Sequence, residues 1–244
     1  MNVVSRAARA AAVVLAVGVA CCAAAEEDPY ASPRWGSFDL SVSGYRPNID
    51  SEFGGAAAPY QTAFGGGRSL MFRGDLAKSF FVPLGVVELG VGAGFSSKSG
   101  SGQLPGGGAS GDSTSLKIIP TRLFVSYRLE YLVEHYPIPL APYVRLSLDR
   151  YWWWVTNGSG DVARSGNQSG SGATNGYSLS AGVALQLDFF DRTLAREMDH
   201  DTGINHTYLF AEFTKSYIKD FGSSQSWDLS DDRVTISGGI LFVF

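Results

Sequence analysis

Three histidines are the side chains of this chain best suited to acid–base chemistry near neutral pH: His135, His200 and His206. A hydrolase that works through a nucleophile also needs a base and a group that orients the base, all within hydrogen-bond reach. None of the three histidines stands in a serine-containing catalytic motif that we recognise. The sequence therefore predicts no catalytic residue, and an enzyme is kept only as an alternative.

The segment from Asp199 to Asn205 carries oxygen-bearing side chains at alternate positions together with Gly203, faintly as in a calcium-binding loop. An EF-hand loop needs a longer frame and a distant bidentate glutamate, which this spacing does not supply. A capped helix end followed by a turn fits the segment better. The glycine runs at 65–67 and 106–108 lack the strand–loop–helix context of a phosphate loop. We expect no metal site and no cofactor.

Composition limits the class of protein. The 244 residues carry 19 Lys+Arg and 23 Asp+Glu, a formal net charge of −4, and 17% of the residues are charged. With a mean hydropathy of +0.02, the chain is too polar for a helical membrane bundle and too apolar for a disordered protein. The acidic balance gives no electrostatic footprint for nucleic acid, so we expect no such partner. The 30 glycines and 13% aromatic residues favour β-structure.

The N-terminus has the order of features found in an export signal. Arg6 and Arg9 precede an apolar stretch at 10–20 that is too short to span a bilayer as a helix. Ala23 and Ala25 then offer an A-x-A cleavage site. We predict a signal peptide over 1–25, a short N-terminal periplasmic segment over 26–34 and one domain over 35–244.

Cleavage after Ala25 would remove Cys21 and Cys22, so the mature chain would contain no thiol, no disulfide and no cysteine nucleophile. Lipidation of Cys21 is an alternative, although Gly18 stands where an aliphatic residue is usual.

Alternation of apolar and polar residues recurs along the rest of the chain, which is the pattern of half-buried strands. The eight alternating segments are about 35–46, 68–80, 86–97, 115–130, 141–154, 176–189, 206–216 and 232–244. In the weakest of them, 206–216, we place Leu209, Ala211 and Phe213 on the apolar face. In the run Trp152–Trp154 alternation sends the outer two rings outward and Trp153 inward, unless the strand bulges there.

The connections between these segments alternate in kind. Those after odd segments are long and rich in Gly, Ser, Asn and Asp, at 47–67, 98–114, 155–175 and 217–231. Those after even segments are a tight turn near 82–85, a short proline-bearing stretch at 132–140, and 190–205. The last predicts a short helix over 193–198, with Asp191 or Thr193 as its N-cap.

An even number of strands with about ten residues each and long loops at one end is typical of a transmembrane β-barrel. We therefore predict an all-β fold, an eight-stranded antiparallel barrel in the bacterial outer membrane, with long loops outside and the short helix in the periplasm. In that orientation all three histidines lie on the periplasmic side, which disfavours a lipid-modifying enzyme of the outer leaflet. A soluble periplasmic carrier barrel is the other alternative, with its apolar face inward.

Charged residues on the polar face would then line the lumen. An eight-stranded barrel is only wide enough for its own side chains to fill the interior. We predict a packed polar network and a structural or surface-interaction role, with a small-solute channel as an alternative. The predicted network is Arg73, Asp75, Glu88, Arg122, Arg145, Asp149, Glu212 and Arg233, to which the alternation also adds Arg128 and Asp188.

The C-terminal segment, from Ser237 to Phe244, fits an outer-membrane assembly signal. A polar residue, Ser237, is followed two positions later by Gly239, and aromatic residues occupy the alternate positions Phe242 and Phe244. Such a strand can pair with an exposed sheet edge of an assembly machine, with alternate side chains giving specificity. We expect that machinery and outer-membrane lipids as partners. The extracellular ligand and the oligomeric state are left open.

Four blocks spread over most of the mature chain resemble a family of small outer-membrane β-barrels known mainly from myxobacteria and related Gram-negative bacteria. They are the residues 45–53 (YRPNIDSEF), 118–120 (IIP), 138–143 (IPLAPY) and 202–212 (TGINHTYLFAE). The resemblance implies the barrel fold and the outer-membrane location. The family is named by location and fold, so the resemblance supplies no catalytic residues.

Overall fold

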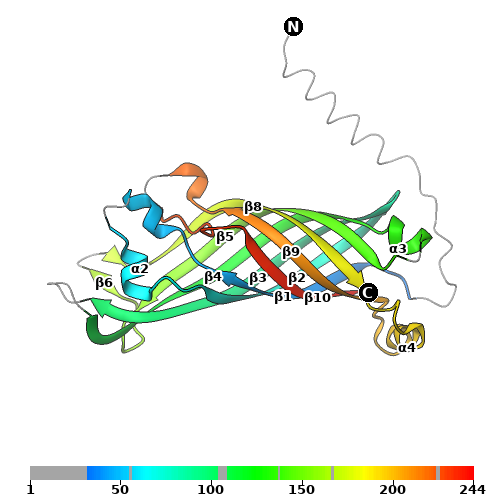
Figure 1. Ribbon diagram of the computed structural model, residues 1–244, viewed down its shortest axis with the longest axis horizontal. Helices are drawn as coiled ribbons and strands as arrows, with labels where there is room; N and C mark the ends of the chain where they lie inside the picture. The colour runs from blue at the N-terminus through cyan, green and yellow to red at the C-terminus, as the bar shows by residue number, and fades with distance from the viewer. Residues whose placement is uncertain (1–31, 55–56, 104–108, 137, 166–167, 224–225) are drawn as a thin grey trace, which may run out of the picture.

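The computed structural model describes residues 32–54, 57–103, 109–136, 138–165, 168–223 and 226–244 (Figure 1). Within them, eight strands close into one barrel in the order β1–β10–β9–β8–β5–β4–β3–β2. Every neighbouring pair is antiparallel, and β1 pairs with β10 to complete the ring. The prediction of an all-β, eight-stranded antiparallel barrel is confirmed.

The strands of the barrel are joined by short helices and one small hairpin. The barrel strands are β1 (Gly36–Tyr45), β2 (Ser69–Val82), β3 (Gly85–Gln103), β4 (Ala109–Leu129), β5 (Leu140–Thr156), β8 (Ser171–Gln186), β9 (His206–Tyr217) and β10 (Thr235–Val243). The hairpin is β6 (Arg164–Ser165) with β7 (Gln168–Ser169). The helical turns are η1 (Ile49–Phe53), α2 (Pro59–Phe64), α3 (Tyr131–His135), α4 (Arg192–Thr202) and η2 (Asp220–Gly222).

The two ends of the barrel differ. We call the end where β1 begins and β10 ends the terminus end; it also carries α3 and α4 (Figure 1). We call the opposite end the loop end; it carries η1, α2, the β6–β7 hairpin and η2. No helix among the described residues is long and apolar enough to cross a bilayer.

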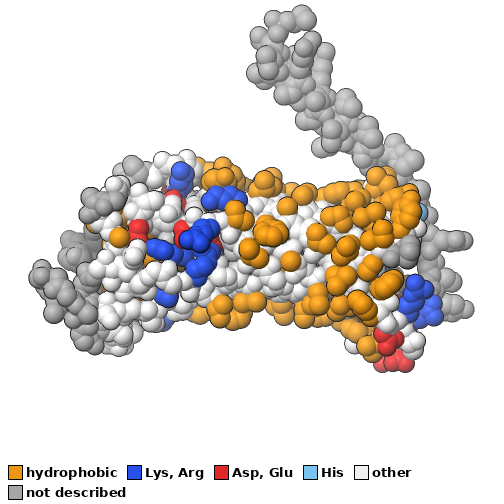
Figure 2. Space-filling model, viewed as in Figure 1, with side chains coloured by type: hydrophobic (Ala, Val, Ile, Leu, Met, Phe, Trp, Pro, Cys, Tyr) orange, Lys and Arg blue, Asp and Glu red, His pale blue; other side chains and the backbone are white. Residues whose placement is uncertain are grey.

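Side chains alternate between the inside and the outside of the barrel, with charge inside and apolar groups outside. On β5, Arg145, Ser147 and Asp149 are buried while Val144, Leu146 and Leu148 are more than half exposed. The same parity holds on β9, where Leu209 and Phe213 face out, as expected. Figure 2 shows the outward apolar side chains as a broad band across the visible face of the barrel.

Several strand ends differ from the predicted segments. β3 and β4 continue as a paired hairpin through most of 98–114, which the sequence predicts as a loop. β8 begins at Ser171 and ends at Gln186, so Asp188 lies beyond the strand. β10 begins at Thr235, which leaves Arg233 outside it. Polar Gly- and Ser-rich stretches weaken the alternation signal, and backbone pairing rather than side-chain pattern sets these ends.

An apolar plug closes the lumen at the loop end. Buried side chains from four barrel strands meet residues of η1, α2 and the segment after η2; the cluster is Tyr45, Ile49, Tyr60, Met71, Leu116, Ile118, Tyr151, Ile218 and Leu229, with Phe64, Trp153, Val155 and Trp227 packed against it. Trp153 points inward, as predicted, and stacks on Trp227 with ring centroids 4.1 Å apart. Tyr45 donates a hydrogen bond to the Leu229 carbonyl at 2.7 Å. Burial raises the pKa of Tyr60 to about 12.

Ion pairs fasten the plug segment to the barrel rim. The Arg68 guanidinium, just before β2, contacts Asp231 at 2.5 Å and Asp232 at 2.6 Å. Asp231 is buried and also accepts a hydrogen bond from the Thr235 hydroxyl at 2.5 Å. Burial raises the pKa of the Asp231 carboxyl. The segment after η2 is therefore tied to both β2 and β10.

The helix α4 begins as the sequence predicts and runs further. Asp191 is its N-cap, and its carboxylate accepts hydrogen bonds from the backbone N–H groups of Thr193 and Leu194, both at 3.0 Å. The helix covers 192–202 rather than 193–198 and ends at Gly203, which has a φ of 73°. The segment from Asp199 to Asn205 is thus a helix end and turn.

Glycine is required at one position of the seam between β1 and β10. Gly239 faces the lumen, and a Cβ there would lie 2.1 Å from the Leu40 carbonyl oxygen and 2.7 Å from the Phe210 ring. A Cβ on the neighbouring Gly238 would meet nothing closer than the Phe210 carbonyl oxygen, at 3.7 Å. A side chain is therefore excluded at Gly239 and tolerated at Gly238.

We expect Gly239→Ala to lower the free energy of unfolding by about 1–3 kcal/mol, because the extra methyl forces the seam apart. The matched control Gly238→Ala should change it by less than about 0.5 kcal/mol. Urea titration of the folded barrel in detergent micelles measures both values. Equal midpoints for the two variants would contradict this account of the seam.

Candidate functional site

A cluster of buried charges fills the middle of the lumen. Asp75 on β2 receives two hydrogen bonds from the Arg122 guanidinium on β4, one of them at 2.8 Å. Arg145 on β5 contacts the same carboxylate at 3.1 Å and Asp39 on β1 at 2.9 Å. It also lies 3.6 Å from Glu212 on β9. Five strands thus contribute to one connected ionic cluster, which we call the central cluster.

The alternation of each strand places these charges. Asp39 stands between outward-facing residues of β1, as do Asp75 on β2 and Arg145 on β5. The register sets their depth, because Asp39 pairs directly with Asp75 and Arg122 with Asp149. Buried charges are costly unless they are paired and hydrogen-bonded, so this arrangement stabilises the barrel only as a complete set.

A second group of charges lies between the central cluster and the terminus end. Arg128 contacts Glu88 at 3.1 Å and Glu130 at 2.9 Å. The Glu88 carboxylate also accepts hydrogen bonds from the hydroxyls of Ser37 at 2.8 Å and Ser126 at 2.9 Å. Glu88 is only 3% exposed. Three strands are therefore joined by this carboxylate and its partners.

Little free space separates the two groups of charges. A cavity of about 10 Å³ lies against Asp39, Arg128 and Arg145. It is about the size of one water molecule. Among the described residues, Asp39 Oδ1, Arg128 Nη2 and Arg145 Nε are buried atoms without a hydrogen-bond partner, and all three residues line this cavity. The space suits a bridging water and admits no larger solute.

The sequence-predicted network falls into three sets. Asp75, Glu88, Arg122, Arg145 and Glu212 are paired within the two charged groups. Asp149 accepts hydrogen bonds from the hydroxyls of Ser147 and Ser178, and Arg73 donates to the Tyr151 hydroxyl at 2.9 Å. Arg233 is outside the lumen: it precedes β10, and its side chain is 81% exposed.

Sequence reasoning left Asp39, Glu130 and Arg34 out of the predicted network. Asp39 alternates with Phe38 and Leu40, so its strand parity alone could have assigned it to the lumen. Glu130 follows the end of β4, and Arg34 precedes β1, contacting Glu130 at 3.3 Å. Glu130 ends the predicted segment 115–130 and continues the inward parity of Arg128, so the alternation could have included it. Arg34 precedes the first segment, where no periodic signal reaches.

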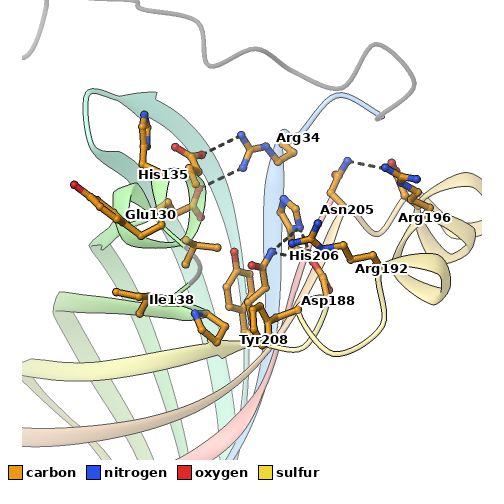
Figure 3. Close-up of a pocket in the computed structure, with 18 of the residues that line it drawn as sticks. Arg34, Glu130, His135, Ile138, Asp188, Arg192, Arg196, Asn205, His206 and Tyr208 are labelled. Atoms are coloured by element: carbon orange, nitrogen blue, oxygen red, sulfur yellow. Dashed lines mark hydrogen bonds and ion pairs between the residues drawn. The ribbon is translucent and has the colours of Figure 1, made fainter.

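A cavity of about 600 Å³ opens at the terminus end, and we call it the mouth cavity (Figure 3). Figure 3 shows Arg34 and Glu130 on one side and Arg192, Asn205 and His206 on the other. Arg34 bridges Glu130 and Glu134 of the α3 region. Asp188, beyond β8, contacts His206 Nδ1 at 2.6 Å. The mouth cavity is lined by charged and apolar side chains together and lies beyond the closed lumen.

The three histidines lie at the terminus end in separate surroundings. His135 on α3 stacks against Tyr131 with ring centroids 4.3 Å apart. His200 on α4 is exposed, and its hydrogen bond with Asp201 raises the pKa of the imidazole. His206 pairs with Asp188, and its ring also contacts Gln186 at 3.1 Å. Within the described residues, no serine, threonine or cysteine side chain hydrogen-bonds to any of them.

Asp199 at the end of α4 accepts hydrogen bonds from Ser32 and from the Asn205 side chain. Both contacts tie the helix to the barrel rim. In the described part of the chain, no group of three or more His, Cys, Asp or Glu residues is arranged to hold a metal ion.

The predicted assembly residues divide between the two faces of β10. Ser237 and Gly239 face the lumen. Phe242 and Phe244 alternate with the buried Leu241 and Val243. The Phe244 ring packs edge-on against Trp35 at 4.7 Å. The predicted cleavage residues Ala23 and Ala25, and Cys21, lie outside the described residues.

No protein-family model and no curated protein matches this chain. Solved barrels resemble it weakly. The N-terminal β-barrel domain of Pseudomonas aeruginosa OprF is 13% identical with a TM-score of 0.40, over 87% of this chain and 100% of that one. P. aeruginosa OprG is 13% identical with a TM-score of 0.42, over 89% and 99%. Ail of Yersinia pestis, solved with the heparin analogue sucrose octasulfate, is 12% identical with a TM-score of 0.40, over 86% and 97%. Similarity at this level supports no functional conclusion.

We expect Arg145→Ala to lower the free energy of unfolding by about 3–5 kcal/mol, because it leaves the buried Asp39 and Glu212 carboxylates without their cation. The control Arg233→Ala removes an exposed guanidinium and should change it by less than about 0.5 kcal/mol. Urea titration in micelles, followed by tryptophan fluorescence, gives both numbers. A small effect of Arg145→Ala would show that the central cluster does not hold the barrel together.

Proposed function

We propose that this chain is an integral outer-membrane β-barrel that does not conduct solutes and serves a structural or surface-interaction role. One observation carries the proposal: the barrel is apolar outside and charged inside. Leu70 and Ile236 face outward at 62% and 63% exposure, whereas Asp75 is 2% exposed in the lumen. A soluble carrier would need the opposite distribution.

An apolar belt of this extent requires an apolar surrounding medium, because soluble proteins seldom expose apolar patches beyond a few hundred Å². On β2 the outward residues from Leu70 to Phe80 are apolar except for Gly74 and Lys78, which stands next to last. Ten strand residues tilted by about 40° cover roughly 25 Å along the barrel axis. That height matches the hydrocarbon band of a transmembrane barrel, and closure leaves no unpaired strand edge in lipid.

We orient the barrel with the terminus end in the periplasm and the loop end outside. The long connections with η1, α2 and η2 lie at the loop end, and the turn at Val82–Gly85 lies at the terminus end. Barrels of this class have short periplasmic turns and longer external loops. On this orientation the plug faces the exterior and the mouth cavity faces the periplasm.

The filled lumen supports a non-conducting barrel rather than a small-solute channel. The plug, the central cluster and the Arg128 group occupy successive levels, and the space between the last two fits a single water. A barrel that does not conduct would interact with other molecules through the surfaces at its two ends. A non-enzymatic role agrees with the separate placement of the histidines.

We also propose that the last strand is read by an outer-membrane assembly machine. Alternation leaves Phe242 and Phe244 on the outward face, where an unfolded strand could present them while pairing through its backbone. Gly239 has a second, steric reason to be glycine in the folded barrel.

We expect the refolded chain to migrate faster on a gel before boiling than after. Liposomes that contain the folded chain should release no trapped small sugar. A folded barrel resists the detergent of the gel, and its plugged lumen blocks diffusion. Protein-free liposomes give the background for leakage. Heat-independent migration would overturn the membrane barrel, and sugar release by folded protein would overturn the closed lumen.

Cysteine accessibility tests the orientation. Ser159, between β5 and β6, and Thr202, at the end of α4, are both exposed and lie at opposite ends. We expect a membrane-impermeant maleimide to label Ser159→Cys on intact cells and Thr202→Cys only after lysis. The reverse result would invert the barrel, and labelling of neither in intact cells but both after lysis would favour a periplasmic protein.

A further inference from the structure

A cation interrupts the outward apolar row of β5. The outward residues of this strand run Val144, Leu146, Leu148, Arg150 and Trp152, and Arg150 is the first charge in the row. A charge on the lipid face of a barrel costs about 2–4 kcal/mol at the bilayer midplane and close to nothing near the interface. Arg150 therefore marks the level where the belt meets the lipid headgroups on the loop side.

The surroundings of Arg150 hold its side chain in place. Its guanidinium lies 4.3 Å over the Trp152 ring. Thr121 on β4 donates a hydrogen bond to the Arg150 carbonyl at 2.9 Å and accepts one from Trp152 Nε1 at 3.3 Å. In the described part of the chain Arg150 forms no ion pair within 4 Å, although its charge helps to lower the pKa of the Asp220 carboxyl on η2. An anion from outside the chain would therefore compete only with this more distant carboxylate.

A shallow groove of about 590 Å³ on the outer wall begins at this cation. Its apolar lining comes from Val91, Leu123 and Leu148 on three adjacent strands. Its polar rim is Arg150, Thr121 and Asn175, and the last two pair directly with Arg150 across the sheet. Polar groups at one edge and apolar groups below are the two halves of a site for an amphiphile.

Phe221 lines the same groove from η2. This residue has a φ of 56° and its side chain is 69% exposed. The turn is held beside the barrel because Asp220 accepts hydrogen bonds from Asn175 at 2.8 Å and from Ser226 at 3.1 Å. An exposed phenyl ring fixed next to a lipid-facing cation would pack against an acyl chain.

We propose that this groove binds the phosphorylated headgroup and acyl chains of an outer-leaflet glycolipid of the lipid A type. Arg150 would bind a phosphate oxygen by charge-assisted hydrogen bonds, the contact for which a guanidinium is best suited. The acyl chains would lie on Val91, Leu123 and Leu148. The apolar lining crosses three strands, about 10 Å, so it offers width for more than one chain.

Two further outward cations lie on the loop side of the belt. Lys117 on β4 pairs opposite Trp154, and Lys215 on β9 lies 5.8 Å from the Tyr217 ring. Lys117 and Lys215 lie four residues along their strands from the row of Arg150, in opposite directions, and their charge favours an anionic lipid on the loop side.

The assignment rests on the proposed orientation, because lipid A occupies the outer leaflet. The test uses the full chain refolded in dodecyl maltoside micelles, with folding scored first by heat-dependent gel migration. Native mass spectrometry then follows titration with bisphosphorylated lipid A, dephosphorylated lipid A and phosphatidylglycerol. If the unsubstituted chain shows no heat-dependent gel migration, the proposed membrane barrel is wrong. If it folds but binds the three lipids equally well, only the proposed groove is wrong.

We expect Arg150→Gln to weaken lipid A binding at least fivefold, because it removes the charge that contacts phosphate. The matched control Arg233→Gln removes an exposed arginine before β10 and should change binding less than twofold. Phe221→Ser, on a turn outside the sheet, should also weaken binding and serves if Arg150→Gln fails to fold. Lipid A affinity that is unchanged in Arg150→Gln or in Phe221→Ser would overturn the proposal. The proposal would also be overturned if phosphatidylglycerol bound as tightly as lipid A and if its binding depended equally on Arg150.

Discussion

The pairing of Arg145 with three carboxylates is the interaction on which the middle of this barrel depends. Asp39, Asp75 and Glu212 come from three different strands; without the Arg145 guanidinium, Asp39 and Glu212 would be uncompensated buried charges and Asp75 would keep only Arg122. Such charges cannot pay their desolvation by Coulomb attraction alone, so the full hydrogen-bonded set is needed. The cluster therefore specifies the register of the sheet, because a shift by one residue would turn every charge toward the apolar side.

The layers above and below the central cluster follow from the same constraint. Near the loop end the inward positions include the apolar and aromatic residues of the plug, which segments folding back over the rim can cover. Near the terminus end the inward positions carry Arg128 and Glu88, and the lumen then opens into the mouth cavity. One end of the lumen is thus sealed by the plug, and the other opens toward water. Any exchange of protons or water with the interior would come from the terminus end.

The alternation of side chains predicted the barrel and most of its interior, because inside and outside differ in polarity at every second residue. It placed Asp75, Glu88, Arg122 and Arg145 in the lumen. It failed for Arg233, which lies two residues before β10 begins, where the alternation no longer applies. The plug residues Trp227 and Leu229 could not be found this way. They lie in a connection, whose path depends on tertiary contacts and not on a repeating pattern.

The seam between β1 and β10 also sets when the barrel can close. It joins Ser37 to Val243, and the Trp35 N–H binds the Phe244 carbonyl at 2.7 Å, so the paired residues are roughly 200 positions apart in the chain. Bringing together the ends of so long a loop costs about 5 kcal/mol in chain entropy, whereas each hairpin costs far less. The hairpins would form first and the seam last, leaving a curved sheet with two open edges as the long-lived intermediate. Seam residues would then govern the closing rate far more than the equally well-packed residues of the hairpins.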